Sequence, residues 1–119
     1  MMIVGIEHVQ LAMPAGGEDA ARAFYTGMLG LPERTKPPKL AARGGCWFEA
    51  PGVKLHLGVE SDFHPAQKAH PALLVDDLSA LVALLDDWDF PVVPDDPVDG
   101  RARCYVSDPF GNRIELIQG

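Results

Sequence analysis

Four side chains in this sequence are of the types that bind a divalent transition metal: His8, His56, His70 and Glu115. Imidazole nitrogens combined with a carboxylate suit Zn, Fe, Mn, Co or Ni. Three histidines and one carboxylate on an octahedral ion leave two positions open, and open positions permit chemistry on a bound substrate. We therefore predict one divalent metal ion per site, held by these four residues.

The four candidate ligands occupy matching positions of an internal repeat. The segment 43–59 aligns with the segment 101–117, and one extra residue in the second turn moves the offset from 58 to 59 residues, which pairs His56 with Glu115. A strand opening near His8 matches one opening near His70, at an offset of 62 residues. The candidate ligands thus form two repeat-related pairs, and a pseudo-twofold axis would bring all four together.

The alternation of apolar and polar residues places the candidates on one face of their strands. Successive side chains of a strand point to opposite faces. His8, His56 and Glu115 each alternate with apolar strand residues. If the apolar face packs against helices, the three polar side chains line the opposite, concave face. A lone histidine in a strand is more often an ordinary polar or core residue, but symmetric positions for all four favour a metal site.

The elements that must position these residues follow the same order twice. One helix is predicted within 16–32, with acidic residues in its first turn and Gly30 and Pro32 as stop signals. A second helix is predicted within 76–91, with Asp76 or Asp77 as its N-terminal cap. Leu78, Leu81, Leu85 and Trp88 form the apolar stripe of the second helix. Segments 37–45 and 94–100 are predicted loops. The fold class is α+β: two tandem βαβββ units forming a curved mixed sheet, or cup, with helices on its convex side. One domain spans 1–119, with units at about 1–61 and 68–119.

Composition restricts the possible partners. The net charge of −7 opposes binding to nucleic acid, and the ten Lys and Arg residues form no run. The opening apolar stretch is too short for a signal peptide or membrane span, which predicts a soluble cytoplasmic protein without membrane partners. Cys46 and Cys104 are predicted to be small strand residues without chemistry, and His64 a loop residue. Arg43 and other strand-flanking arginines are either solvated or contacts for an anionic substrate.

Four motifs carry a family resemblance: HVQLAMP (8–14), FYTGMLGL (24–31), HPALLVDDL (70–78) and SDPFGNRIELIQ (107–118). With them, nearly the whole chain resembles the glyoxalase, bleomycin-resistance and extradiol-dioxygenase superfamily, also called vicinal oxygen chelate proteins. The resemblance implies a cup of paired βαβββ units, a homodimer, and metal ligands at His8 and His70 in first strands and at His56 and Glu115 in last strands. The departure is His56, where glyoxalase I proteins usually carry glutamate.

The resemblance favours an enzyme that chelates a small oxygenated substrate to the metal, with Glu115 as ligand and general base. A glyoxalase-like lyase or isomerase is the first choice, ahead of an extradiol-type dioxygenase and a fosfomycin-type resistance transferase. A metal-free small-molecule binding protein of the bleomycin-resistance type is the alternative from another class, and a purely structural metal is a third. The sequence leaves open whether the units pair within one chain or swap across a dimer.

Overall fold

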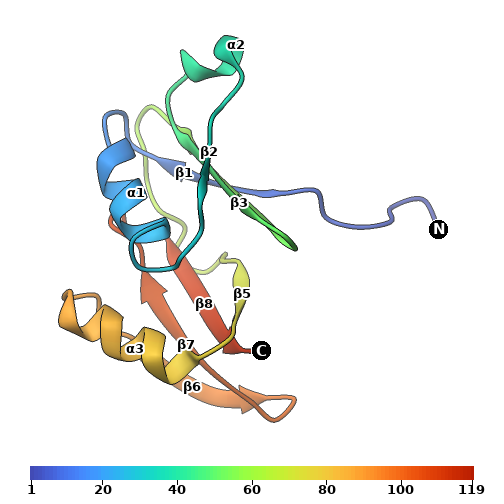
Figure 1. Ribbon diagram of the computed structural model, residues 1–119, viewed down its shortest axis with the longest axis vertical. Coiled ribbons are helices and arrows are strands. Elements are labelled where there is room, and N and C mark those ends of the chain that lie inside the picture. Colours follow the sequence, from blue (N-terminus) through green and yellow to red (C-terminus); the bar gives the residue numbers. More distant parts are fainter. The chain divides into compact units, whose positions relative to one another are not determined.

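The computed structural model describes residues 1–119, which divide into two compact units, Met1–Phe63 and His64–Gly119 (Figure 1). Each unit contains a strand, a helix and then three strands, with the single-turn helix α2 (Pro38–Ala41) inserted after the second strand of the first unit, and the predicted α+β class is confirmed. None of the helices combines the length and the apolarity that crossing a membrane would require.

The first unit holds a four-stranded mixed sheet. Its elements are β1 (Val9–Met13), α1 (Glu18–Tyr25), β2 (Glu33–Arg34), α2 (Pro38–Ala41), β3 (Cys46–Ala50) and β4 (Val53–Val59). The strand order is β1-β4-β3-β2, with β1 parallel to β4 and the other neighbours antiparallel. β4 is therefore central, which places its residues between two partner strands.

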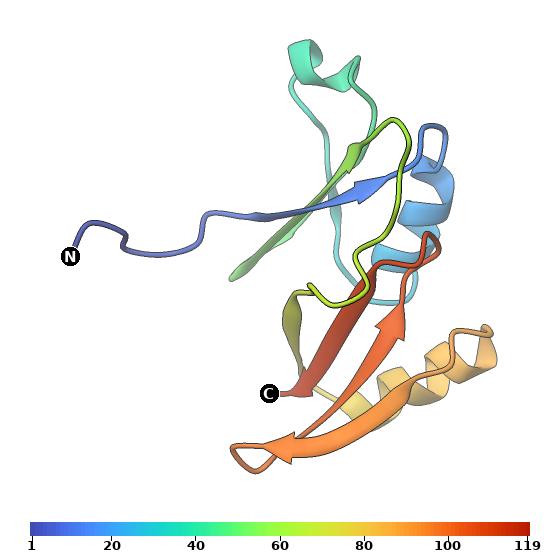
Figure 2. The same cartoon turned by 180° about the vertical axis from the view of Figure 1, so that it is seen from behind.

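The second unit repeats this arrangement. Its elements are β5 (Ala72–Val75), α3 (Leu78–Asp87), β6 (Val93–Val98), β7 (Arg101–Ser107) and β8 (Arg113–Gln118). The strand order β5-β8-β7-β6 corresponds to β1-β4-β3-β2, and β5 is again parallel to β8. In the reverse view, α3 runs along one side of this sheet (Figure 2).

Strand register confirms the sequence repeat residue by residue. Gln10 is the partner of His56 across β1 and β4, and Ala72 is the partner of Glu115 across β5 and β8. On the antiparallel side, Trp47 pairs with His56 as Tyr105 pairs with Glu115. These pairings reproduce all three offsets found in the sequence, so His56 and Glu115 hold the same place in the two sheets.

The core of the first unit lies between α1 and the sheet. Phe24 and Tyr25 of α1 are fully buried, as are Phe48 of β3 and Leu55 and Leu57 of β4. The Tyr25 and Phe48 rings stack with centroids 5.3 Å apart. Because Phe48 and Leu55 face the helix, strand alternation turns Trp47 and His56 to the other side of the sheet, as the sequence predicted for His56.

The core of the second unit lies between α3 and β8. The Asp77 side chain caps the helix by accepting a hydrogen bond from the Ala80 N–H at 3.1 Å, which confirms one of the two predicted caps. Leu78 and Leu85 are buried as predicted, but Trp88 is 63% exposed. Placing Trp88 in the apolar stripe was wrong, because the helix ends at Asp87 and the chain then leaves the helical period.

Both predicted connecting loops contain regular structure. Segment 37–45 includes the single turn α2, which begins with proline at its first position. Segment 94–100 lies mostly in β6, although it contains Pro94 and Pro97. Proline lacks the N–H that an interior strand needs, but β6 is the edge strand and bonds only to β7. The predicted loop was wrong because sequence alone does not distinguish an edge strand from a turn.

Both cysteines are expected to be unreactive in the folded protein. Cys46 and Cys104 are buried free thiols, and burial raises the pKa of Cys46 to about 11 and also raises that of Cys104. The reactive form is the thiolate. At pH 8, a chromogenic disulfide reagent should therefore label neither thiol in native protein and both after unfolding in guanidinium. Labelling of native protein at the unfolded rate would contradict this.

Candidate metal centre

His70 and Glu115 form a close pair in the second unit. The distance from His70 Nε2 to Glu115 Oε1 is 2.9 Å. His70 stands two residues before β5 and Glu115 is central in β8, and the Glu115 N–H donates to the Pro71 carbonyl at 3.0 Å. The parallel pairing of the two strands therefore delivers the imidazole to the carboxylate.

The second ring nitrogen of His70 defines its tautomer. His70 Nδ1 lies 2.8 Å from the Lys68 carbonyl oxygen. A carbonyl oxygen only accepts hydrogen bonds, so Nδ1 must carry the proton. Nε2 is then the nitrogen that faces Glu115 Oε1, where it shares a proton with the carboxylate or offers its lone pair to a metal ion that displaces this proton. Histidines that bind metals are commonly held in this way, with the second nitrogen donating to a carbonyl or carboxylate.

Glu115 is buried, 7% exposed, and its second oxygen is held by an arginine. Glu115 Oε2 lies 3.4 Å from Arg103 Nη1, and Arg103 also contacts the Tyr105 hydroxyl at 2.7 Å and Asp95 at 3.2 Å. Burial works to lower the pKa of Arg103, but attraction to Asp95 and the contacts with Tyr105 and Glu115 together outweigh burial and raise the pKa. Arg103 therefore stays charged and supplies the buried carboxylate with a cationic partner.

Tyr105 and Arg113 form the wall beside His70. The Tyr105 ring meets the imidazole edge to face, with centroids 5.3 Å apart, and the Arg113 guanidinium lies 3.9 Å from the Tyr105 ring centroid. Arg113 also donates to the Lys68 carbonyl at 3.3 Å. These contacts restrict the rotation of His70, so its Nε2 is presented in one direction.

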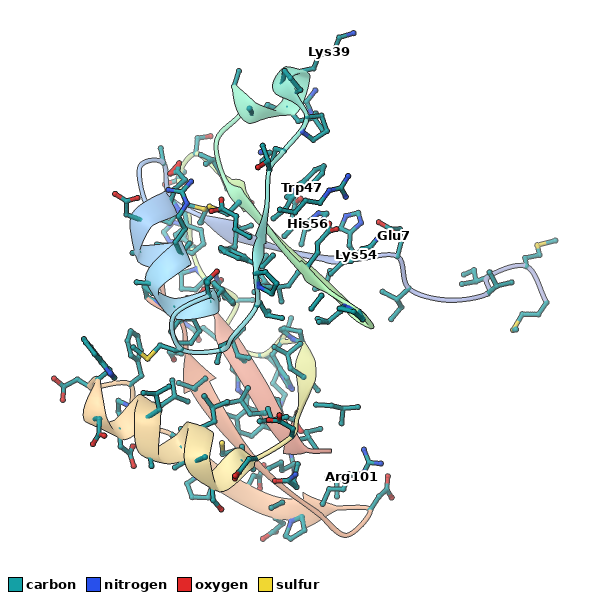
Figure 3. The ribbon with its side chains drawn as sticks, in the orientation of Figure 1. Glu7, Lys39, Trp47, Lys54, His56 and Arg101 are labelled. Carbon is teal, nitrogen blue, oxygen red and sulfur yellow. The ribbon has the colours of Figure 1, made fainter.

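The other candidate pair lies in the first unit, within a stack of rings. His56 is 5% exposed because its ring lies between Trp47, at a centroid distance of 4.5 Å, and His8, at 4.4 Å. The Trp47 and His56 rings lie next to each other beyond β3 (Figure 3). His8 precedes β1, and its Nδ1 lies 3.3 Å from Glu7 Oε1. The repeat thus brings His8 to His56 as it brings His70 to Glu115.

Glu49 holds His56 from the neighbouring strand. Glu49 Oε2 lies 2.7 Å from His56 Nε2, and Glu49 Oε1 accepts a hydrogen bond from Arg34 at 3.1 Å. The bond to His56, followed by Arg34, lowers the pKa of Glu49 and keeps it ionised. An ionised carboxylate only accepts, so Nε2 donates and a neutral His56 has its lone pair on Nδ1. Any metal bond from His56 in this state therefore uses Nδ1.

The structure brings the four predicted ligands together as two pairs, His8 with His56 and His70 with Glu115. Neither unit by itself gathers three His, Cys, Asp or Glu side chains into a metal-binding group. The meeting of both pairs on one ion stays a prediction. Sequence reasoning missed Glu49 and predicted Arg103, like the other strand arginines, to be either solvated or a contact for an anionic substrate. The alternation of both residues with buried strand residues places them on the same faces as His56 and Glu115.

Residues 5–116 match the family model described as Glyoxalase/Bleomycin resistance protein/Dioxygenase superfamily. The chain belongs to this superfamily. The resemblance seen in the four sequence motifs is thereby confirmed over nearly the whole length, and the two mixed sheets are those of the glyoxalase fold. Among curated protein sequences, none matches the chain significantly.

Solved structures of the glyoxalase superfamily give the same fold. A glyoxalase family protein from Bacillus anthracis is 44% identical, with 100% of this chain and 98% of that chain covered and a TM-score of 0.93. The fosfomycin resistance protein FosX from Listeria monocytogenes is 16% identical, and the alignment covers 99% of this chain and 95% of FosX with a TM-score of 0.78. TnmS3, an antibiotic binding protein from Streptomyces sp. CB03234, is 23% identical, and the alignment covers 99% of this chain and 98% of TnmS3 with a TM-score of 0.70. At the two lower identities, the comparison shows the fold alone.

Proposed function

We propose that this glyoxalase-superfamily protein is a divalent-metal-dependent enzyme acting on a small oxygenated substrate, most simply a glyoxalase-like lyase or isomerase. One observation carries the proposal: His70 donates Nδ1–H to a backbone carbonyl and presents Nε2 to Glu115 at 2.9 Å. A homodimer in the cytoplasm is part of this proposal.

The residues fit such an ion. Adjacent ligands on an octahedral ion, each about 2.1 Å from the metal, are separated by about 3.0 Å, and the 2.9 Å between His70 Nε2 and Glu115 Oε1 is close to this spacing. His8 and His56 would supply the other two donors. Three imidazoles and one carboxylate suit Zn, Ni, Fe, Mn or Co.

A bound divalent ion would polarise the substrate oxygens and stabilise negative charge that develops on them. Glu115 would accept a proton from the substrate at a carboxylate oxygen. Arg103 holds the other oxygen of that carboxylate, and the Lys68 carbonyl holds the His70 ring. Trp47 and Tyr105, at equivalent places in the two sheets, fix the rings of the two ligand pairs.

Within the enzyme class, an extradiol-type dioxygenase and a fosfomycin-type resistance transferase are the alternatives, the latter supported by the fold shared with FosX. A metal-free small-molecule binding protein is the alternative from another class. Two observations favour it: the fold shared with TnmS3, and the engagement of His56 by Glu49 and two stacked rings.

Metal content tests the proposal. Protein purified without affinity-tag metal or chelator should contain about one transition-metal ion per chain, measured by elemental analysis. His8→Ala and His70→Ala should lose this metal, and His64→Ala, the same substitution at an exposed histidine outside every strand, should retain it. No metal in wild-type protein, even after reconstitution with Zn, Ni, Fe, Mn and Co, would overturn the enzyme proposal in favour of the binding protein.

Three readouts on metal-loaded protein separate the reaction classes. A lyase or isomerase that removes a proton beside a carbonyl should exchange that proton for deuterium, which NMR detects. A dioxygenase should consume O₂ with a catechol-type substrate, and a thiol transferase should consume thiol. Because each class consumes or exchanges a different atom, one panel of substrates discriminates among them.

A further inference from the structure

The first unit contains a cavity of about 460 Å³ beside its histidine pair. One end is lined by His8, His56 and Trp47. The segment that includes α2 lines the other end, and it contributes Lys36, Leu40 and Arg43. The cavity thus extends from the candidate metal ligands to a segment without any carboxylate.

The charges around the cavity do not cancel. Its two carboxylates are already paired: Glu7 contacts Lys54 at 2.7 Å, and Glu49 contacts Arg34 at 3.1 Å and His56 at 2.7 Å. The Arg43 side chain lines the cavity and makes no ion pair or hydrogen bond, while its backbone N–H donates to the Leu40 carbonyl.

Lys36 is the second cation at the same end. Its ammonium group donates to the Gly44 carbonyl and has no carboxylate partner. The Glu18 carboxylate lies near Gly44 but forms no ion pair with Lys36 or Arg43, so in a chain of net charge −7 the α2 end of this cavity carries two unpaired cations.

We propose that the cavity binds a small organic carboxylate, with its charged group at Arg43 and Lys36 and its apolar body against Trp47, Leu40 and Val59. A small carboxylate would be the substrate class of the proposed enzyme. The inference rests on the proposed function in one respect: the opposite end of the cavity, where His8 and His56 lie, is taken to hold the metal. A guanidinium donates two parallel hydrogen bonds to a carboxylate and an ammonium adds a third, whereas a neutral amide of the same shape gains little of this charge-assisted bonding.

The test uses the full chain with Trp88→Phe, which leaves Trp47 as the sole tryptophan. Metal is removed with chelator, so that the carboxylate cannot bind through an ion. Phenylacetate and phenylacetamide, matched in shape but not in charge, are titrated at constant ionic strength while Trp47 fluorescence is followed. We expect phenylacetate to bind about tenfold more tightly than phenylacetamide, as one charge-assisted contact gives.

Arg43→Gln should reduce this ratio to about threefold or less, because only the Lys36 ammonium then remains to favour the carboxylate. Arg101→Gln is the matched control: it makes the same charge change at an exposed residue of the second unit that does not line the cavity, and it should leave the ratio unchanged. Equal binding of the two probes, no change of Trp47 fluorescence up to about 20 mM phenylacetate, or equal effects of the two substitutions would each overturn the proposal.

Metal binding, measured separately by calorimetry, distinguishes this failure from failure of the proposed function. Metal binding without a preference for the carboxylate overturns the inference about the cavity and leaves the metalloenzyme standing. A preference for the carboxylate without metal binding supports the cavity and overturns the metalloenzyme.

Discussion

A Glu115→Gln variant is expected to bind divalent metal about a hundredfold more weakly than the wild-type protein. The substitution keeps the size of the side chain but replaces an anionic donor by a neutral amide. The amide also has N–H groups that compete for His70 Nε2, the nitrogen now 2.9 Å from Glu115 Oε1. Isothermal titration calorimetry with Zn²⁺ and Ni²⁺ measures the change in affinity.

Glu60→Gln provides the control for this prediction. Glu60 directly follows β4 and is exposed, so the same chemical change there should leave the affinity for metal unchanged. Circular dichroism and urea unfolding establish that both variants are folded. An unchanged affinity in Glu115→Gln would remove Glu115 from the ligand set and with it the base of the proposed reaction.

Phe48→Ala is expected to reduce the free energy of unfolding by about 3 to 5 kcal/mol. Phe48 is fully buried in β3 and stacks on Tyr25 of α1, so truncation removes ring contacts and leaves a cavity between the helix and the sheet. A loss of this size is a large part of the roughly 5 to 15 kcal/mol that stabilises an ordinary domain. Urea unfolding at 25 °C should show a lower midpoint.

Trp88→Ala is the comparison for the Phe48 variant. It removes a larger aromatic side chain that is 63% exposed, so its effect on unfolding should be within about 0.5 kcal/mol. Similar losses in the two variants would contradict the assignment of Phe48 to the core. Such a result would also contradict the assignment of Trp47 and Glu49 to the face of β3 opposite Phe48.

The fold was largely predictable because its signals are local. Alternation in β4 and β8 and the Pro and Gly residues of the hairpin turns define register within each unit, and the repeat checks one unit against the other. The prediction failed where a signal had two meanings. Pro94 and Pro97 favour a loop, yet an edge strand tolerates both.

The candidate ligands were predictable as types and positions, but their supporting residues were not. Glu49 reaches His56 from β3, and Arg103 reaches Glu115 from β7. Such contacts depend on which residues are opposite each other in neighbouring strands, and this register follows from pairing rather than from either strand alone. The tautomers of His56 and His70 depend on the same contacts and also required the structure.

The outer strand of the second sheet has a consequence for how the protein behaves at high concentration. Every residue of β6 is exposed, and Val93 and Val98 present apolar surface there. An exposed strand edge is normally a template on which other chains add strands and begin to aggregate. Pro94 and Pro97 lack N–H groups, the register shifts between Asp95 and Val98, and the aspartates add negative charge. This edge therefore ends the sheet, and fibrillar growth along β6 is opposed by the same prolines that concealed the strand in the sequence.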